Sequence, residues 1–315
     1  MASNETAQEE LRANFESLHL PRDEEEKLKD WIRSSKRRIE ILITGRTGTG
    51  KSTLVNALIG KDVAGTGSNL AVTTKHVTGH TVKAGESTEI VVWDSPGLQD
   101  GSGEEDEYLT QMRENCKDID IIIYCIDVSA GRAQLQGAEV NQMKDLCAIK
   151  QLTANFGTNC WEHSIFVLTR ANALETSLKV KDNPEKIFQD RLKDWEKRIH
   201  AALSKEGVPI EIANQVPVKP AGYPKKPHLL GHQYWLSELW FAFMKNAKNP
   251  SQPTITRVNQ HRFQKENETT TEDFKKEGHE QPIISDTTWD TCPIEGTVTI
   301  GFLVRNRSWT LPAMY

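Results

Sequence analysis

The chain has 315 residues, of which 37% are hydrophobic and 26% are charged, and its formal net charge is -5. Acidic and basic residues are interleaved, so we expect no extended positive field and no nucleic acid as a partner. The five cysteines form no CxxC pair, which favours reduced thiols in a cytoplasmic protein over disulfides or a zinc site. The polar N-terminus is unlike a signal peptide, and no apolar run approaches the roughly 20 residues of a transmembrane segment.

The pattern along the chain predicts three parts. Residues 1–37 are highly charged, with apolar residues at helical spacing, which predicts a helical N-terminal extension that packs on the core or on a partner. In residues 38–248 short apolar runs alternate with helical segments, which is typical of an α/β domain whose mostly parallel sheet is flanked by helices. Residues 249–315 are polar and lose this periodicity, which predicts a linker and a poorly ordered tail. Strands are predicted at 39–44, 76–82, 88–94, 119–127, 163–169 and 215–220, and helices at 51–60, 106–116, 134–148, 184–204 and 232–247.

The first predicted strand and helix are joined by GRTGTGKS, residues 45–52. This stretch fits G-x-x-x-x-G-K-[ST], in which glycines let backbone N–H groups turn inward around phosphates at the positive end of a helix. Lys51 is expected to reach the outer phosphates, and the Ser52 hydroxyl to ligate Mg²⁺. The predicted nucleotide-binding residues here are Gly45, Arg46, Thr47, Gly48, Thr49, Gly50, Lys51, Ser52 and Thr53.

A second phosphate element closes the third predicted strand with Asp94-Ser95-Pro96-Gly97. A carboxylate at this strand end lies beside the phosphate loop in a P-loop fold, so we expect Asp94 to hold Mg²⁺ through water. The Gly97 amide is expected to sense the γ-phosphate. The short spacing from Lys51 to Asp94 favours a GTPase over a large ATPase.

Between these elements lies the threonine pair Thr73-Thr74, preceded by a Gly-rich loop. A threonine at this point can close on Mg²⁺ and the γ-phosphate and release after hydrolysis, and position favours Thr74 slightly over Thr73. The loops around 63–75 and 97–107 are therefore predicted to be the switch segments.

These motifs, together with IDIIIYCIDV and LTRAN further along, resemble the septin-related branch of the P-loop GTPases. Within it the chain is most similar to the AIG-type G domain of the immunity-associated GTPases (GIMAP-like), which is also related to chloroplast import-receptor GTPases. The resemblance covers roughly residues 38–248 and implies a G domain that binds GTP and GDP with Mg²⁺, hydrolyses slowly and associates as a dimer or oligomer in the GTP state.

The resemblance also identifies Thr169-Arg170-Ala171-Asn172 as the base-recognition motif. The Arg170 stem or guanidinium plane can stack on the base. Asn172 offers one acceptor oxygen where most GTPases have a carboxylate, which costs about 1–3 kcal/mol of guanine discrimination. Ala221 or Gly222, after the last strand, is expected to present an amide to the guanine O6.

The position that carries a water-orienting glutamine in many GTPases is Leu98 here, with Gln99 one residue further on. Leucine cannot orient water, so slow intrinsic hydrolysis is predicted. Lys51, Thr74 and Gly97 are the predicted catalytic residues, with a further cation from Arg46 or Arg132, in the same molecule or across a dimer.

The sequence therefore predicts a slow Mg²⁺-dependent GTPase that acts as a conformational or assembly switch. Two alternatives remain open: a nucleotide-binding scaffold without turnover, indicated by Leu98 and Asn172, and an ATP-using P-loop enzyme.

Overall fold

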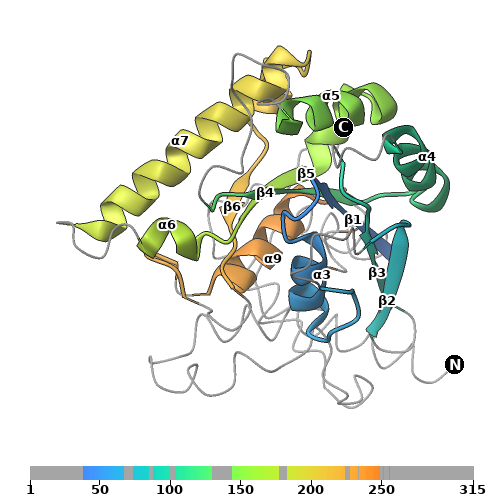
Figure 1. The fold of residues 1–315 in the computed structure, drawn as a ribbon, viewed down its shortest axis with the longest axis horizontal. Coiled ribbons are helices and arrows are strands. Elements are labelled where there is room, and N and C mark those ends of the chain that lie inside the picture. The colour runs from blue at the N-terminus through green and yellow to red at the C-terminus, as the bar shows by residue number, and fades with distance from the viewer. Residues whose placement is uncertain are drawn as a thin grey trace, which may run out of the picture.

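The structure, a computed structural model, describes residues 38–66, 74–84, 88–98, 104–129, 144–176, 183–223, 228–232, 234–248, 251 and 255. These residues form a six-stranded sheet of order β2-β3-β1-β4-β5-β6, with helices on both faces (Figure 1). The strands are β1 (Arg38–Gly45), β2 (Thr78–Ala84), β3 (Thr88–Asp94), β4 (Ile121–Asp127), β5 (Ser164–Thr169) and β6 (Val218–Pro220). The helices are α3 (Lys51–Ile59), α4 (Glu105–Asn115), α5 (Lys144–Phe156), α6 (Asn172–Thr176), α7 (Pro184–Lys205), α8 (Ile210–Ala213) and α9 (Trp235–Asn246), with a 3₁₀ turn at Thr158–His163. The predicted N-terminal extension lies outside the described residues.

The central strands are buried on both faces, because α4, α5 and α7 cover one side of the sheet and α3 and α9 the other (Figure 1). Every residue of β4 and β5 is buried, as is every residue of β1 after Arg38. Near-continuous apolar runs of this kind are typical of parallel strands between two helical layers. Because β1, β3, β4 and β5 run parallel, their carboxyl ends lie along one edge of the sheet, where the loops that carry the predicted motifs meet.

The sheet is parallel except at one edge, where β2 pairs antiparallel with β3. The other edge strand, β6, has three residues and ends at Pro220, which suits an edge position because proline cannot donate to a further strand. A mostly parallel α/β sheet, as the sequence predicts, is confirmed.

Two predicted elements differ from the structure. The helix predicted at 134–148 is observed as α5, Lys144–Phe156, while residues 134–143 lie outside the described part. Gly157 ends α5 with a φ of 80°, and its N–H donates to the Thr153 carbonyl at 2.9 Å. The strand predicted at 215–220 begins only at Val218, because the chain before it is occupied by α8 and a turn in which the Gln215 N–H donates to Ile212. Helices as short as α6 and α8 carry too little periodicity to be recognised from sequence.

The core extends beyond the boundary predicted at residue 248. The fully buried Asp120 carboxylate accepts the Glu40 N–H at 2.8 Å and the Ser251 hydroxyl at 2.5 Å. Ile255 is also fully buried in the hydrophobic core. Residues 251 and 255 thus belong to the folded domain, at the edge of the sheet opposite the phosphate motifs.

Replacement of Asp120 by alanine is expected to lower the free energy of unfolding by about 2–3 kcal/mol, because two buried donors lose their acceptor. Asp118→Ala is the matched control: its ion pair with Lys248 is exposed, so the loss is expected to stay below about 1 kcal/mol. Urea unfolding of both variants measures the difference. Equal destabilisation by the two substitutions would contradict the buried anchor.

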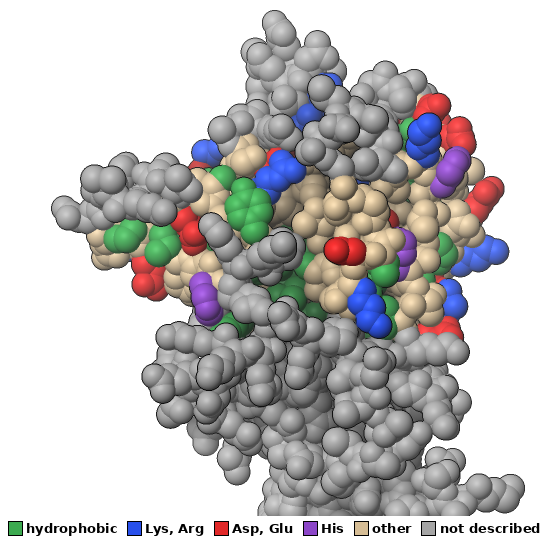
Figure 2. All heavy atoms as spheres, turned by 60° about the horizontal axis from the view of Figure 1, so that its bottom comes forward, with side chains coloured by type: hydrophobic (Ala, Val, Ile, Leu, Met, Phe, Trp, Pro, Cys, Tyr) green, Lys and Arg blue, Asp and Glu red, His purple; other side chains and the backbone are tan. Residues whose placement is uncertain are grey.

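On the face shown in Figure 2, the described cationic, acidic and histidine side chains are interspersed. None of the helices in the described part of the chain combines the length and the apolar character that crossing a bilayer requires.

Candidate functional site

The phosphate loop, residues 45–52, turns from β1 into α3 at the carboxyl edge of the sheet. Gly45 is needed for close approach, since a Cβ there would lie 2.5 Å from the Cys125 carbonyl oxygen. Gly50 caps α3 in the left-handed region, with a φ of 85° and no side-chain hydrogen bond to the helix. The first turn of α3 also lacks acidic residues. Its N–H groups and helix dipole are therefore arranged for an anion rather than for a capping carboxylate.

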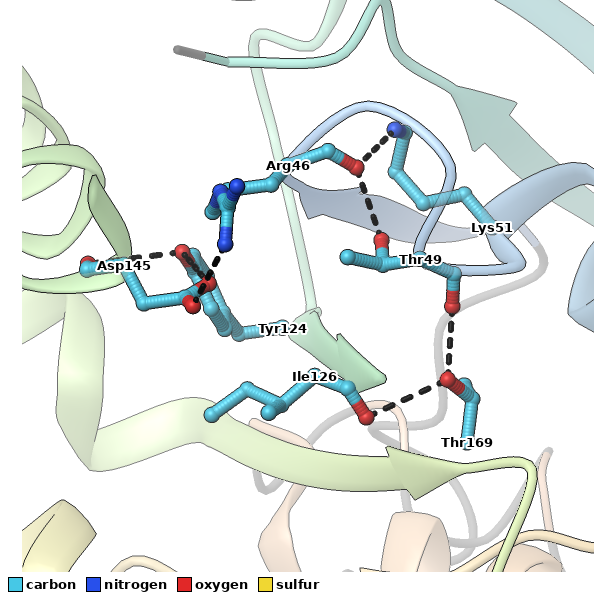
Figure 3. A network of polar contacts seen from close by, with 7 residues as sticks. All are labelled: Arg46, Thr49, Lys51, Tyr124, Ile126, Asp145 and Thr169. Carbon is cyan, nitrogen blue, oxygen red and sulfur yellow. Dashed lines mark hydrogen bonds and ion pairs between the residues drawn. The ribbon is translucent and has the colours of Figure 1, made fainter. Parts of the chain in front are cut away.

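The Lys51 amine lies inside this loop. Its side chain is 6% exposed, and Nζ donates to the Arg46 carbonyl at 2.9 Å (Figure 3). The Thr49 hydroxyl donates to the same carbonyl at 2.8 Å. The loop thus holds a buried cation at the point where the sequence places the outer phosphates.

Three oxygen-bearing side chains from separate segments converge beside Lys51. The Ser52 hydroxyl donates to Asp94 Oδ2 at 2.7 Å, Thr74 Oγ1 lies 3.3 Å from the same oxygen, and the two hydroxyl oxygens are 3.4 Å apart. The other carboxylate oxygen, Asp94 Oδ1, is buried without a hydrogen bond. Burial raises the pKa of Asp94, with the Ser52 hydrogen bond and the Lys51 charge acting against it. One carboxylate and two hydroxyls, with an unsatisfied oxygen among them, fit the oxygen ligation that Mg²⁺ prefers.

The chain after Asp94 runs directly against the phosphate loop. The Leu98 N–H donates to the Gly45 carbonyl at 3.1 Å, and Leu98 pairs with Arg46 as an isolated parallel bridge. A Cβ on Gly97 would lie 2.0 Å from the Thr47 hydroxyl, so only glycine fits this contact. The Leu98 side chain is fully buried. Gln99 and Arg132, together with Thr73, lie outside the described residues.

The Arg46 guanidinium points away from Lys51 (Figure 3). Its Nη1 donates to Asp145 Oδ2 at 3.2 Å, and the Tyr124 hydroxyl lies 3.3 Å from the other oxygen of that carboxylate. Asp145 stands in the first turn of α5 and is 1% exposed. In this conformation the ion pair between Arg46 and Asp145 links the phosphate loop to α5. A catalytic role for Arg46 requires this ion pair to open.

The predicted base motif is tied to the phosphate loop by Thr169. Its hydroxyl donates to the Thr49 carbonyl at 2.6 Å and contacts the Ile126 carbonyl at 3.1 Å (Figure 3). Arg170 has a φ of 57°, and its guanidinium pairs with Asp127 at the end of β4. Arg170 is therefore held at this edge of the sheet by the carboxylate of Asp127, which is not among the predicted site residues.

Asn172 is 7% exposed, and its side-chain oxygen accepts the Tyr223 N–H at 2.7 Å. The Ala221 N–H donates to the Leu168 carbonyl at 2.9 Å. Of the two amides predicted to read a base, the one on Ala221 is thus already used within the sheet, which leaves Gly222. Asp127, the last residue of the apolar strand β4, could have been predicted from the sequence, whereas Asp145, Glu175 and Tyr223 carried no such signal.

Residues 40–156 match the family model described as 50S ribosome-binding GTPase. The structure is similar to Toc33 from Arabidopsis thaliana in complex with Mg²⁺ and GMPPNP, at 22% identity and a TM-score of 0.51, covering 76% of this chain and 90% of that one. A second structure, described as showing that dimerization is important for the GTPase activity of the chloroplast translocon components atToc33 and psToc159, gives 22% identity and a TM-score of 0.53, with 76% and 89% covered. The fold is that of a P-loop G domain.

Two curated relatives match part of this G domain. Immune-associated nucleotide-binding protein 7 from Arabidopsis thaliana is 31% identical over 144 residues, which are 45% of this chain and 44% of that protein. GTPase Era from Lactobacillus delbrueckii subsp. bulgaricus is 30% identical over 96 residues, 30% of this chain and 31% of that protein. The chain therefore matches less than half the length of either relative. These similarities lie within the part of the chain that forms the G domain, and they are to a GTPase and a nucleotide-binding protein.

Proposed function

We propose that this chain binds guanine nucleotide with Mg²⁺, hydrolyses GTP slowly and acts as a conformational or assembly switch through G-domain dimerisation. The observation that carries the proposal is the convergence of Ser52, Thr74 and Asp94 beside the buried Lys51 amine. Such a cluster is a place for a metal ion next to phosphates, and its members come from the three segments that sense nucleotide state in GTPases.

In this function the phosphates bind the N–H groups at the start of α3 and the Lys51 amine. The amine would exchange its hydrogen bond with the Arg46 carbonyl for one with a phosphate oxygen. Lys51 then neutralises charge that develops on the transferred group. Ser52, Thr74 and Asp94 would hold Mg²⁺, which would supply further neutralisation of the phosphate charge. Gly97 contributes its N–H from the segment that packs on Thr47.

Slow hydrolysis is supported by the packing of Leu98. Its side chain is fully buried, so the position after Gly97 offers no group that orients water. The Arg46 guanidinium is engaged by Asp145. A second cation beside Lys51 would come from Arg132, or from Arg46 once its ion pair with Asp145 opens.

The switch and dimer are supported by similarity in fold to Toc33, whose dimerization is described as important for GTPase activity. Membership of the AIG-type, GIMAP-like family is supported by the match to immune-associated nucleotide-binding protein 7. We place the switch in the segments around Thr74 and Gly97, because Thr74 contacts Ser52 and Gly97 packs on Thr47, both in the phosphate loop. The N-terminal extension at 1–37 would modulate these segments or the dimer surface.

The first experiment is the affinity of nucleotide-stripped protein for GTP, GDP and ATP with and without Mg²⁺, followed by turnover and sizing on the same sample. We expect guanine preference, slow GTP turnover and association in the GTP state. Equal affinity for ATP would instead indicate an ATP-using enzyme.

Lys51→Ala is expected to lower GTP turnover by about 100–1,000-fold, because it removes the cation aimed at the phosphates. Lys61→Ala, an exposed lysine just beyond α3, is the matched control and should leave turnover unchanged. Tight GTP binding with the same residual turnover in wild type and Lys51→Ala would favour a scaffold without hydrolysis.

A further inference from the structure

The side-chain amide of Asn172 contacts a hydrogen-bond donor through its oxygen and an acceptor through its nitrogen. Its Oδ1 accepts the Tyr223 N–H at 2.7 Å, and its Nδ2 lies 3.4 Å from Glu175 Oε2. A flipped amide would direct its NH₂ group at the Tyr223 N–H and its oxygen at the Glu175 carboxylate, and both contacts are unfavourable. The orientation of the Asn172 amide is therefore determined by its surroundings.

Glu175 is itself fixed. Its Oε1 accepts the Leu230 N–H at 2.6 Å, from the turn in which Leu229 and His232 pair. His232 is held in place by Glu238, 2.6 Å from Nδ1, and by Gln189, 3.1 Å from Nε2. The carboxylate cannot turn away from Asn172 without losing this contact with the 228–232 turn.

An aspartate at position 172, the residue type that most GTPases use to read guanine, would place a second carboxylate beside Glu175. Asn172 is buried and Glu175 is half-buried, so two carboxylates about 3–4 Å apart here would repel each other more strongly than in bulk water. Glu175 therefore makes asparagine the compatible residue at position 172.

We propose that Glu175 is a specificity-determining residue that holds position 172 as an amide, so that the base site accepts 6-oxopurine nucleotides with relaxed selection at the purine C2 group. This inference rests on the proposed binding of nucleotide at this site. Guanine presents two donors, at N1 and at the C2 amine, whereas xanthine presents a donor at N1 and an acceptor at C2. One amide oxygen cannot provide the charge-assisted pair that a carboxylate gives to both guanine donors, and the amide NH₂ can donate to the xanthine C2 oxygen.

The test compares the dissociation constants of GDP and xanthosine diphosphate, with Mg²⁺, for wild type, Glu175→Gln, Asn172→Asp and the double variant. In wild type we expect the two dissociation constants to lie within about tenfold of each other. Glu175→Gln is the single-variant arm of this cycle: it removes the charge at position 175, while the glutamine oxygen can still accept from Asn172. Glu211→Gln, at an exposed carboxylate on α8, is the control and should match wild type.

Asn172→Asp alone is expected to weaken GDP binding by about tenfold or more, through repulsion with Glu175. The double variant should restore GDP binding and prefer GDP to xanthosine diphosphate by about 100-fold, because the amide introduced at position 175 can donate to the carboxylate introduced at position 172. Rescue of this kind separates pairing with Glu175 from a general loss of folding, which thermal unfolding of each variant also monitors.

The inference is overturned if Asn172→Asp alone strengthens GDP binding and selectivity to the level of the double variant, since Glu175 would then have no influence on position 172. Preference of wild type for GDP over xanthosine diphosphate by about 100-fold would overturn it as well. Failure of the proposed function has a different signature: no purine diphosphate would bind wild-type protein at all.

Discussion

Gly97→Ala is expected to abolish most GTP turnover and to destabilise the domain. The added Cβ would lie 2.0 Å from Thr47 Oγ1, 2.4 Å from Thr47 Cα and 2.5 Å from Thr47 N. Two of these atoms are backbone atoms of the phosphate loop, so the clash cannot be relieved by a side-chain rotation. Overpacking of this kind costs about 1–3 kcal/mol, and displacement of catalytic groups by about 1 Å can lower turnover about 100-fold.

Single-turnover kinetics and thermal unfolding measure the two effects. Gly65→Ala is the matched control, because a Cβ at position 65 meets no heavy atom within 4 Å. We expect that variant to keep the wild-type melting temperature, which is the measurement that reports the steric effect. Wild-type behaviour of Gly97→Ala would show that the segment after Asp94 does not pack on the phosphate loop in solution.

The second large effect is expected from Asp94→Asn, which keeps the size of the side chain and removes its charge. Affinity for Mg²⁺ in the presence of GDP should fall by about 10–100-fold, the range for groups that hold a metal indirectly. Metal-free protein should not lose stability. Because burial raises the pKa of Asp94 in the folded chain above its unfolded value, ionisation of this carboxyl destabilises the metal-free fold, and an amide avoids that cost.

Titration of Mg²⁺ against the protein with GDP, followed by melting temperatures with and without metal, tests both statements. Asp62→Asn serves as control, since Asp62 is an exposed carboxylate near the end of α3. An unchanged Mg²⁺ dependence in Asp94→Asn would remove the metal site from the cluster with Ser52 and Thr74.

Most strand positions follow from the sequence because buried parallel strands are apolar along their whole length. Ile41 to Ile43 and Ile121 to Ile126 are examples of such apolar runs, and the structure places both in the centre of the sheet. The helix boundaries were predicted from the sequence less accurately than the strand positions. The end of α5 was predicted eight residues early, at 148 rather than at Phe156. The short α6 and α8 were missed, because a single turn of helix is stabilised by what it packs on rather than by its own periodicity.

The phosphate end of the candidate site was determined by the sequence alone. A glycine-rich turn between an apolar strand and a helix is a local structure, and the residues that shape it are contiguous. Tertiary structure adds that Ser52 and Asp94, 42 residues apart, are hydrogen-bonded, and that Arg46 is held by Asp145, 99 residues away.

The base end was decided by tertiary structure. Asn172 could be read from the sequence as a poor substitute for a carboxylate, but its partner Tyr223 lies 51 residues away, and Glu175 is fixed by Leu230, 55 residues away. A polar side chain at a loop takes its role from the donors and acceptors that the fold brings to it. Those donors and acceptors become known only once the chain has closed around the sheet.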